Sequence, residues 1–145
     1  MGGDEERVLL LDTHIWVWYV ENEPKRFSRR IVSRVESAIG RGALVVSAIS
    51  VWEVAQLEAR GRLELAVDVR TWVARALSFP GLRLHALSPS VAIDSTHLPG
   101  SLHRDPADRV LIATARRLGA ALVTCDQRIL EYARAGHVKV LDATP

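Results

Sequence analysis

The sequence predicts an α/β fold in which a parallel sheet of five strands is flanked by helices on both faces. Short aliphatic runs recur along the chain without regular alternation, which is typical of strands buried on both faces. Segments with an apolar stripe and helical spacing separate these runs. Strands that alternate with helices in this way join through right-handed crossovers into a parallel sheet.

The length and composition of the chain indicate one folded domain. Its 145 residues are enough for a single core, so we expect one domain over residues 1–145. The hydrophobic content is 48% and the charged content 25%, as in a folded soluble protein. The apolar runs are too short to cross a bilayer, and residues 1–6 are acidic, unlike a signal peptide. We therefore expect no membrane partner and a cytoplasmic location.

The five predicted strands are the aliphatic runs. They cover residues 7–12, 43–46, 82–87, 120–124 and 138–141. The third run alternates apolar and polar residues to some extent, so we expect it at an edge of the sheet. The single cysteine, Cys125, cannot form an internal disulfide and is expected to be a buried thiol.

Each predicted helix has a recognisable start, stop or apolar stripe. In chain order the helices cover residues 13–20, 27–40, 47–60, 68–77, a short segment that opens at 88–90, 105–118 and 127–135. Asp68 and Ser88 suit N-caps, and Pro89 suits a first helical position. Gly119 and Gly136 lie where the last two helices should end.

The helix that opens at Asp105 is the centre of the predicted site. Asp105 is placed as its N-cap, Pro106 suits the first helical position, and Asp108 falls at the third. Residues 110–115 leave almost no polar side, so we expect this helix to be buried with its acidic start open to a cleft. Capping alone could also explain a carboxylate at this position, because a helix N-terminus stabilises each negative charge by about 0.3–1 kcal/mol.

Three further acids follow predicted strands. Asp12 ends the first strand, Glu53 lies soon after the second, and Asp126 follows the fourth. Ligands of such sheets bind beyond the carboxyl ends of the strands, so these acids share one edge if the three strands are neighbours. Asp108 joins them only if the loop before its helix folds back across that edge. Capping explanations remain open for Glu53, through a Ser50–Glu53 capping box, and for Asp126.

Four carboxylates in one pocket would need protons or a cation. Two like charges 4 Å apart repel by about 4 kcal/mol at an effective dielectric of 20. A pocket of oxygen ligands favours a hard ion, Mg²⁺ or Mn²⁺. The sequence therefore predicts a divalent-metal site if the acids converge.

Four segments of the chain together resemble a PIN domain of the VapC-type toxins. They are residues 9–16, 50–53, 103–115 and 122–126, with sequences LLLDTHIW, SVWE, HRDPADRVLIATA and LVTCD. The resemblance implies a small endoribonuclease that requires Mg²⁺ or Mn²⁺ and has a five-stranded parallel sheet. It also implies an RNA substrate, a homodimer, and inhibition by a VapB-like antitoxin that covers the acidic cleft.

The resemblance assigns roles by motif position. The catalytic acids and metal ligands that it implies are Asp12, Glu53, Asp108 and Asp126. The residues that it places around them are Thr13, Thr124, His103, Asp105 and Arg109.

Arginines on the second predicted helix suggest an RNA contact. Arg26, Arg30 and Arg34 recur at four-residue spacing opposite the apolar stripe, and nearly all basic residues of the chain are arginines. A solvated helix face and a phosphate-binding patch both explain this stripe.

The sequence fits two other functions poorly and leaves two more open. A receiver domain would show an acidic pair after the first strand and an acid after the third, whereas Asp12 stands alone and the third run ends in Leu87-Ser88. A nucleotide-binding switch would need glycines after the first strand, and Asp12-Thr13-His14 has none. An RNA-processing PIN nuclease without an antitoxin and a non-catalytic, RNA-binding PIN module remain open.

Overall fold

The computed structural model describes residues 7–145, and the acidic segment 1–6 lies outside the described residues. The strands are β1 (Leu9–Leu11), β2 (Leu44–Ser47), β3 (Leu82–His85), β4 (Ala121–Thr124) and β5 (Lys139–Asp142). The helices are α1 (Thr13–Val20), the 3₁₀ helix η1 (Pro24–Arg26), α2 (Arg29–Gly40), α3 (Ala48–Ala59), α4 (Val69–Leu77), α5 (Pro89–Thr96), α6 (Pro106–Leu118) and α7 (Gln127–Ala133). The predicted elements are all present, and most of their ends lie within two residues of the prediction.

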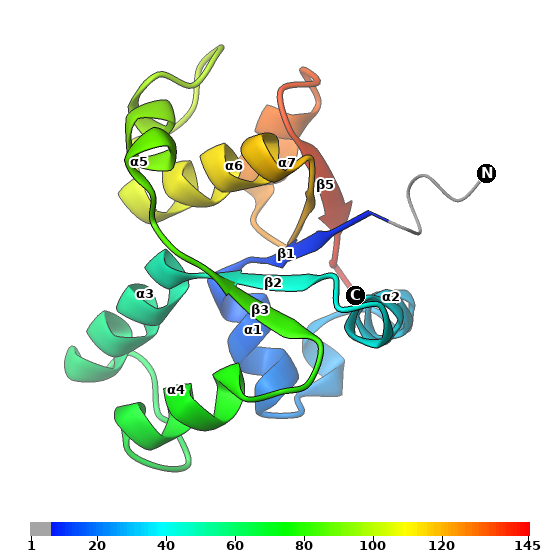
Figure 1. Cartoon of the computed structure of the whole chain (residues 1–145), viewed down its shortest axis with the longest axis vertical. Coiled ribbons are helices and arrows are strands. Elements are labelled where there is room, and N and C mark those ends of the chain that lie inside the picture. Colours follow the sequence, from blue (N-terminus) through cyan, green and yellow to red (C-terminus); the bar gives the residue numbers. More distant parts are fainter. Residues whose placement is uncertain (1–6) are drawn as a thin grey trace.

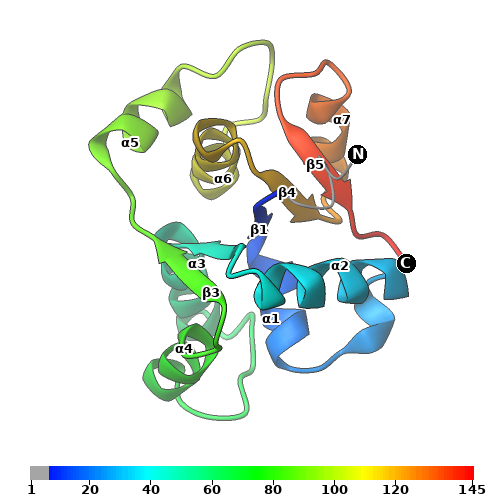
Figure 2. The same ribbon diagram turned by 45° about the vertical axis from the view of Figure 1, so that its right-hand side comes forward.

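The five strands form one parallel sheet in the order β3-β2-β1-β4-β5. Figures 1 and 2 show α1 to α4 on one face of the sheet and α5 to α7 on the other. This arrangement confirms the predicted fold class. The alternating strand β3 lies at an edge, as predicted.

Side chains of β1 are buried on both faces of the sheet because successive residues of a strand point in opposite directions. Leu9 and Leu11 pack into the core under α1 to α4, whereas Leu10 packs with Leu111 and Ile112 of α6. This double burial explains why the first strand is aliphatic throughout. No helix within residues 7–145 combines the length and apolar character that crossing a bilayer requires.

The start of α6 agrees with the prediction from its cap. The carboxylate of Asp105 accepts a hydrogen bond from the backbone N–H of Asp108, and Pro106 occupies the first helical turn. Gly119 ends the helix with φ of 62°, a conformation that glycine adopts without strain. Because α6 precedes a parallel strand, its acidic N-terminus lies at the carboxyl edge of the sheet.

Two details of the predicted helices are wrong. The N-cap of α3 is Ser47, whose hydroxyl accepts from the N–H of Ile49, so Ser50 lies inside the helix. Helix α2 begins at Arg29, and Arg26 belongs to η1, because the chain adopts extended backbone at Phe27 and Ser28. The arginine stripe is therefore divided between two elements.

Candidate active site

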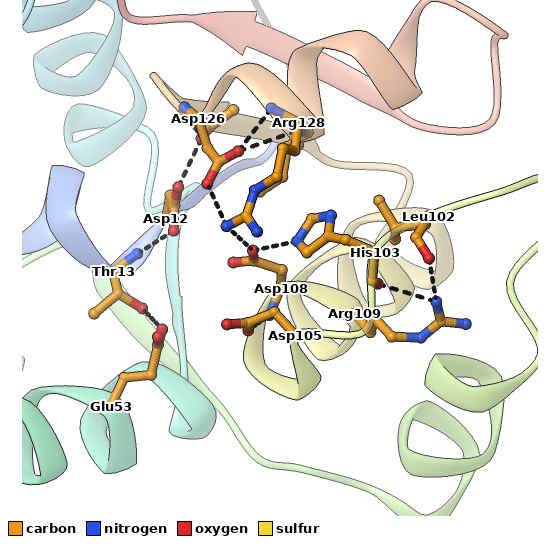
Figure 3. Close-up of polar contacts among 12 residues, drawn as sticks. Asp12, Thr13, Glu53, Leu102, His103, Asp105, Asp108, Arg109, Asp126 and Arg128 are labelled. Carbon is orange, nitrogen blue, oxygen red and sulfur yellow. Dashed lines mark hydrogen bonds and ion pairs between the residues drawn. The ribbon is translucent and has the colours of Figure 1, made fainter.

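The four predicted acids line one pocket at the carboxyl edge of the sheet. Strands β2, β1 and β4 are neighbours, which brings Asp12, Glu53 and Asp126 to this edge, and the start of α6 adds Asp108. The pocket has a volume of about 390 Å³. Figure 3 shows the four side chains around the same opening. The condition that the sequence left open, that the loop before α6 returns to this edge, is met.

Asp12 lies at the floor of the pocket and is only 8% exposed. Its Oδ1 accepts from the N–H of Thr13 at 2.7 Å, and its Oδ2 accepts from the hydroxyl of Thr124 at 2.6 Å. Burial raises the pKa of Asp12, although these two hydrogen bonds oppose the rise. The two threonines therefore hold the Asp12 carboxylate in one orientation.

Glu53 points into the pocket and makes no capping box. The hydroxyl of Thr13 donates to Oε1 of Glu53 and lies 2.8 Å from the hydroxyl of Ser50. A hydroxyl has one proton to donate, so Ser50 must donate to Thr13 when Thr13 donates to Glu53. Burial raises the pKa of Glu53, and the negative charge of Asp12 adds to this rise. The capping explanation for Glu53 is wrong because Ser47, rather than Ser50, starts the helix.

Asp108 is the acid of α6 that faces the pocket, and it too is only 8% exposed. The Nε2 atom of His103 lies 2.7 Å from Oδ2 of Asp108, which fits donation to an ionised carboxylate. Burial raises the pKa of Asp108 to about 6 in spite of this bond. Repulsion by the carboxylates of Asp105, Asp12 and Asp126 contributes to the rise.

Asp126 is both a cap and a lining residue of the pocket. Its Oδ1 accepts from the N–H groups of Arg128 and Ile129 at the start of α7. Its Oδ2 is free of the cap and lies 3.6 Å from Nη2 of Arg128. The same Nη2 atom lies 3.8 Å from Oδ2 of Asp108, so the guanidinium stands between the two carboxylates (Figure 3).

The donor set of this pocket fits a hard divalent cation. All four acids offer carboxylate oxygens, and their mutual repulsion would be relieved by a positive ion. Within residues 7–145, no three acidic, histidine or cysteine side chains are close enough together to form a metal cluster as they stand. A cation would therefore need the carboxylates to move inward or to bind through water, which Mg²⁺ commonly retains.

The other predicted site residues take different places. Arg109 does not line the pocket; its guanidinium donates to the carbonyl oxygens of Ser95, Leu102 and His103. It therefore holds the loop that precedes α6 against α5. The expectation that Cys125 is a buried thiol is wrong: it is half-buried because it lines the acidic pocket, although its partial burial still raises the pKa of the thiol.

The three arginines of the predicted RNA-binding stripe do not line the acidic pocket. Arg30 and Arg34 line a separate pocket with Arg7 and Lys139 near β5. The guanidinium of Arg26 lies 5.3 Å from the ring centroid of Trp18, which does line the acidic pocket. Arg26 therefore lies beside the acidic pocket through its contact with Trp18.

Three of the residues that sequence reasoning missed have polar side chains suited to the chemistry of the site. Arg128 and His14 line the pocket, and Ser50 completes the hydroxyl chain to Glu53. Arg128 and His14 each lie two residues after an acid that begins a helix, Asp126 and Asp12. Position in the first helical turn was therefore an available signal, whereas the contact of Ser50 with Thr13 spans 37 residues and had none.

Comparison with known proteins identifies the family of this chain. Residues 9–135 match the PIN domain family. Over 124 residues the chain is 37% identical to Ribonuclease VapC22 of Mycobacterium tuberculosis (strain ATCC 25618 / H37Rv), covering 86% of this chain and 91% of that protein.

Two solved structures share the fold. The chain is similar to VapBC2 from Rickettsia felis bound to a promoter DNA fragment, with a TM-score of 0.66, 16% identity, and coverage of 93% of this chain and 98% of that one. DNA-bound VapBC from Salmonella typhimurium gives a TM-score of 0.64 at 20% identity, with coverage of 92% and 96%. With the family match and the 37% identical relative, these findings place the chain in the PIN domain family, among its VapC-type members.

Proposed function

We propose that this protein is the toxin of a VapBC-type toxin-antitoxin pair and that it cleaves RNA with the aid of Mg²⁺ or Mn²⁺. The observation that carries the proposal is the convergence of Asp12, Glu53, Asp108 and Asp126 on one pocket. Ribonuclease VapC22, which is 37% identical to this chain, supports the substrate class. The reaction is hydrolysis of a phosphodiester that leaves a 5′-phosphate and a 3′-hydroxyl.

The residues of the pocket would have different roles in such a reaction. The carboxylates would hold the cation, with Asp12 oriented by Thr124 and Asp108 oriented by His103. A bound Mg²⁺ or Mn²⁺ polarises the phosphoryl group and lowers the pKa of an attacking water. Arg128 supplies a positive group at the mouth, where its 62% exposed side chain can reach an RNA phosphate.

The partners follow from the same family assignment. VapBC structures share the fold of this chain, and we propose that a VapB-like antitoxin binds it and covers the acidic pocket. We also propose a homodimer. Exposed large apolar side chains are available for such contacts, namely Trp52, Phe79, Leu84, Leu87, Ile93 and Leu118.

Expression in cells tests the proposed function directly. Induction of the wild-type chain without antitoxin should arrest growth and create new 5′-phosphate RNA ends, mapped by sequencing. Asp108→Asn should abolish both effects, because the variant loses a pocket carboxylate but retains its place in the first turn of α6. Equal RNA cleavage by this variant would contradict the proposal, and intact RNA with tight RNA binding would favour the non-catalytic alternative.

A salt titration tests the proposed RNA contact of the arginines. We expect Arg26→Gln to reduce the slope of log K against log salt by roughly 0.7 on single-stranded RNA, the value for one phosphate contact. Arg30→Gln and Arg34→Gln should change it less, because these residues line the pocket near β5. Arg60→Gln, an exposed arginine just after α3, is the control. If the substitutions of Arg26, Arg30 and Arg34 all leave the slope unchanged, the arginine stripe is only a solvated surface.

A further inference from the structure

A second groove opens beside the acidic pocket, between α7 and the loop that precedes α6. Its volume is about 570 Å³, within the range of about 300–1,000 Å³ that is usual for small-ligand sites. The loop that precedes α6 forms one wall, with Leu102 and His103, and α7 with the turn after it forms the other, with Tyr132 and Ala135. Apart from His103 and Arg128, which border the acidic pocket, the residues of the groove have no role in the proposed RNA cleavage.

The groove and the acidic pocket meet at two side chains. Arg128 lines both of them, and its guanidinium lies within 4 Å of carboxylates on the pocket side. His103 lines the groove while its Nε2 contacts Asp108 of the pocket (Figure 3). A strand with its phosphate at the acids would therefore have the groove immediately beside that phosphate.

The end of the groove is shaped by close packing. The rings of Tyr132 and His137 lie 5.3 Å apart, and the Tyr132 hydroxyl donates to the carbonyl of Pro99. Gly100 has φ of +71°, and a Cβ there would come within 2.8 Å of Nε2 of His137. Glycine thus lets the loop approach the imidazole closely. Contacts within the protein therefore form this end of the groove without a ligand.

The chemistry of the lining fits a flat, uncharged ring next to a phosphate. His103, His137 and Arg128 offer planar groups on which a base can stack. The one carboxylate of the lining, Glu131, forms an ion pair with Arg134 at 2.9 Å, which offsets its negative charge. The positive guanidinium stands at the end nearest the acids, where the phosphate would be.

We propose that this groove binds the nucleoside attached to the scissile phosphate of a bound RNA strand, with Arg128 contacting the phosphate group at the boundary. The proposal rests on the proposed ribonuclease function and deepens it by adding a base-binding subsite. The occupant is one nucleoside of the substrate strand.

An abasic scan with groove-filling variants tests the subsite. A 12-nucleotide RNA with a single cut is first chosen from the products of a random RNA pool, and each nucleotide around the cut is then replaced by an abasic ribose. We expect the abasic change at one of the two nucleotides that adjoin the cut to lower kcat/KM by roughly 5- to 100-fold in the wild type, as for loss of one stacked base.

The variant Ala135→Trp fills the groove from the exposed turn after α7. It should lower kcat/KM on the intact RNA to the abasic level and leave the abasic RNA unaffected. Ala74→Trp, at an exposed alanine of α4 on the opposite face of the sheet, is the matched control and should keep the full difference. Ser101→Trp fills the groove from the opposite wall and replaces Ala135→Trp if that variant fails to fold.

Crosslinking gives a readout that needs no turnover. A 4-thiouridine at the sensitive nucleotide should crosslink, on irradiation, to peptides within residues 100–103 or 127–137. Crosslinks found only elsewhere would overturn the proposal, as would an abasic penalty that persists in the tryptophan variant that fills the groove. If the RNA is cut but neither abasic change next to the cut lowers kcat/KM, the ribonuclease function stands and the proposed subsite is wrong. If no RNA is cut with Mg²⁺ or Mn²⁺, both proposals fall.

Discussion

Asp126→Asn is expected to lower RNA cleavage at least about 100-fold while leaving the free energy of unfolding almost unchanged. Asparagine caps helices about as well as aspartate, so the bonds from Oδ1 to the start of α7 can persist. What the variant loses is the negative charge of Oδ2, which points into the pocket. Loss of an outer partner of a metal ligand already costs 10- to 100-fold, and a ligand itself should cost more. Initial rates on a fluorescent RNA and thermal melts would measure both effects.

Asp68→Asn is the matched control for this experiment. Asp68 also caps a helix, accepting from the N–H of Thr71 at the start of α4, but it does not line the acidic pocket. The same substitution there should leave the cleavage rate unchanged. If Asp126→Asn retained wild-type activity at limiting metal concentration, Asp126 would be only a cap.

Stability without metal is expected to fall as the pH rises from about 4 to 6, because burial raises the pKa of Asp108 in the folded state. A carboxyl whose folded pKa exceeds its unfolded value of about 3.8 stabilises the fold fully below pH 3.8 and loses this contribution progressively as the pH rises to about 6. The shift sets an upper limit of about 3 kcal/mol, which solvent screening reduces to roughly 1–2 kcal/mol. Chemical denaturation between about pH 4 and 7, in the presence of a chelator, would measure the fall.

Asp108→Asn should lose much of this pH dependence, since its amide does not titrate. Addition of Mn²⁺ or Mg²⁺ at about pH 7.5 should stabilise the wild type by about 3 kcal/mol at a concentration of 100 Kd, which raises Tm by roughly 5–10 °C. The rise should be much smaller at pH 5, where protons compete for the carboxylates, and in Asp108→Asn. Equal metal stabilisation of wild type and variant would show that the cation binds elsewhere.

Local signals in the sequence determined the fold and the list of acids. The aliphatic run before Asp12, the Asp105-Pro106 start of α6 and the glycine at 119 each act through neighbouring residues, so their effects can be read along the chain. Parallel strands then fix which ends share an edge. The acids that follow β1, β2 and β4 could therefore be assigned to one edge on the condition that these strands are neighbours, and the strand order of the structure meets that condition.

Contacts between distant residues were decided only by the tertiary structure. Whether Glu53 caps its helix or faces the pocket depended on Thr13, which lies 40 residues away and takes both Ser50 and Glu53 as partners. The place of Arg128 between two carboxylates required the first turns of α6 and α7 to meet at one edge of the sheet. Such contacts depend on how whole elements pack. The residues next to a side chain in the sequence do not specify a partner that folding brings from elsewhere in the chain.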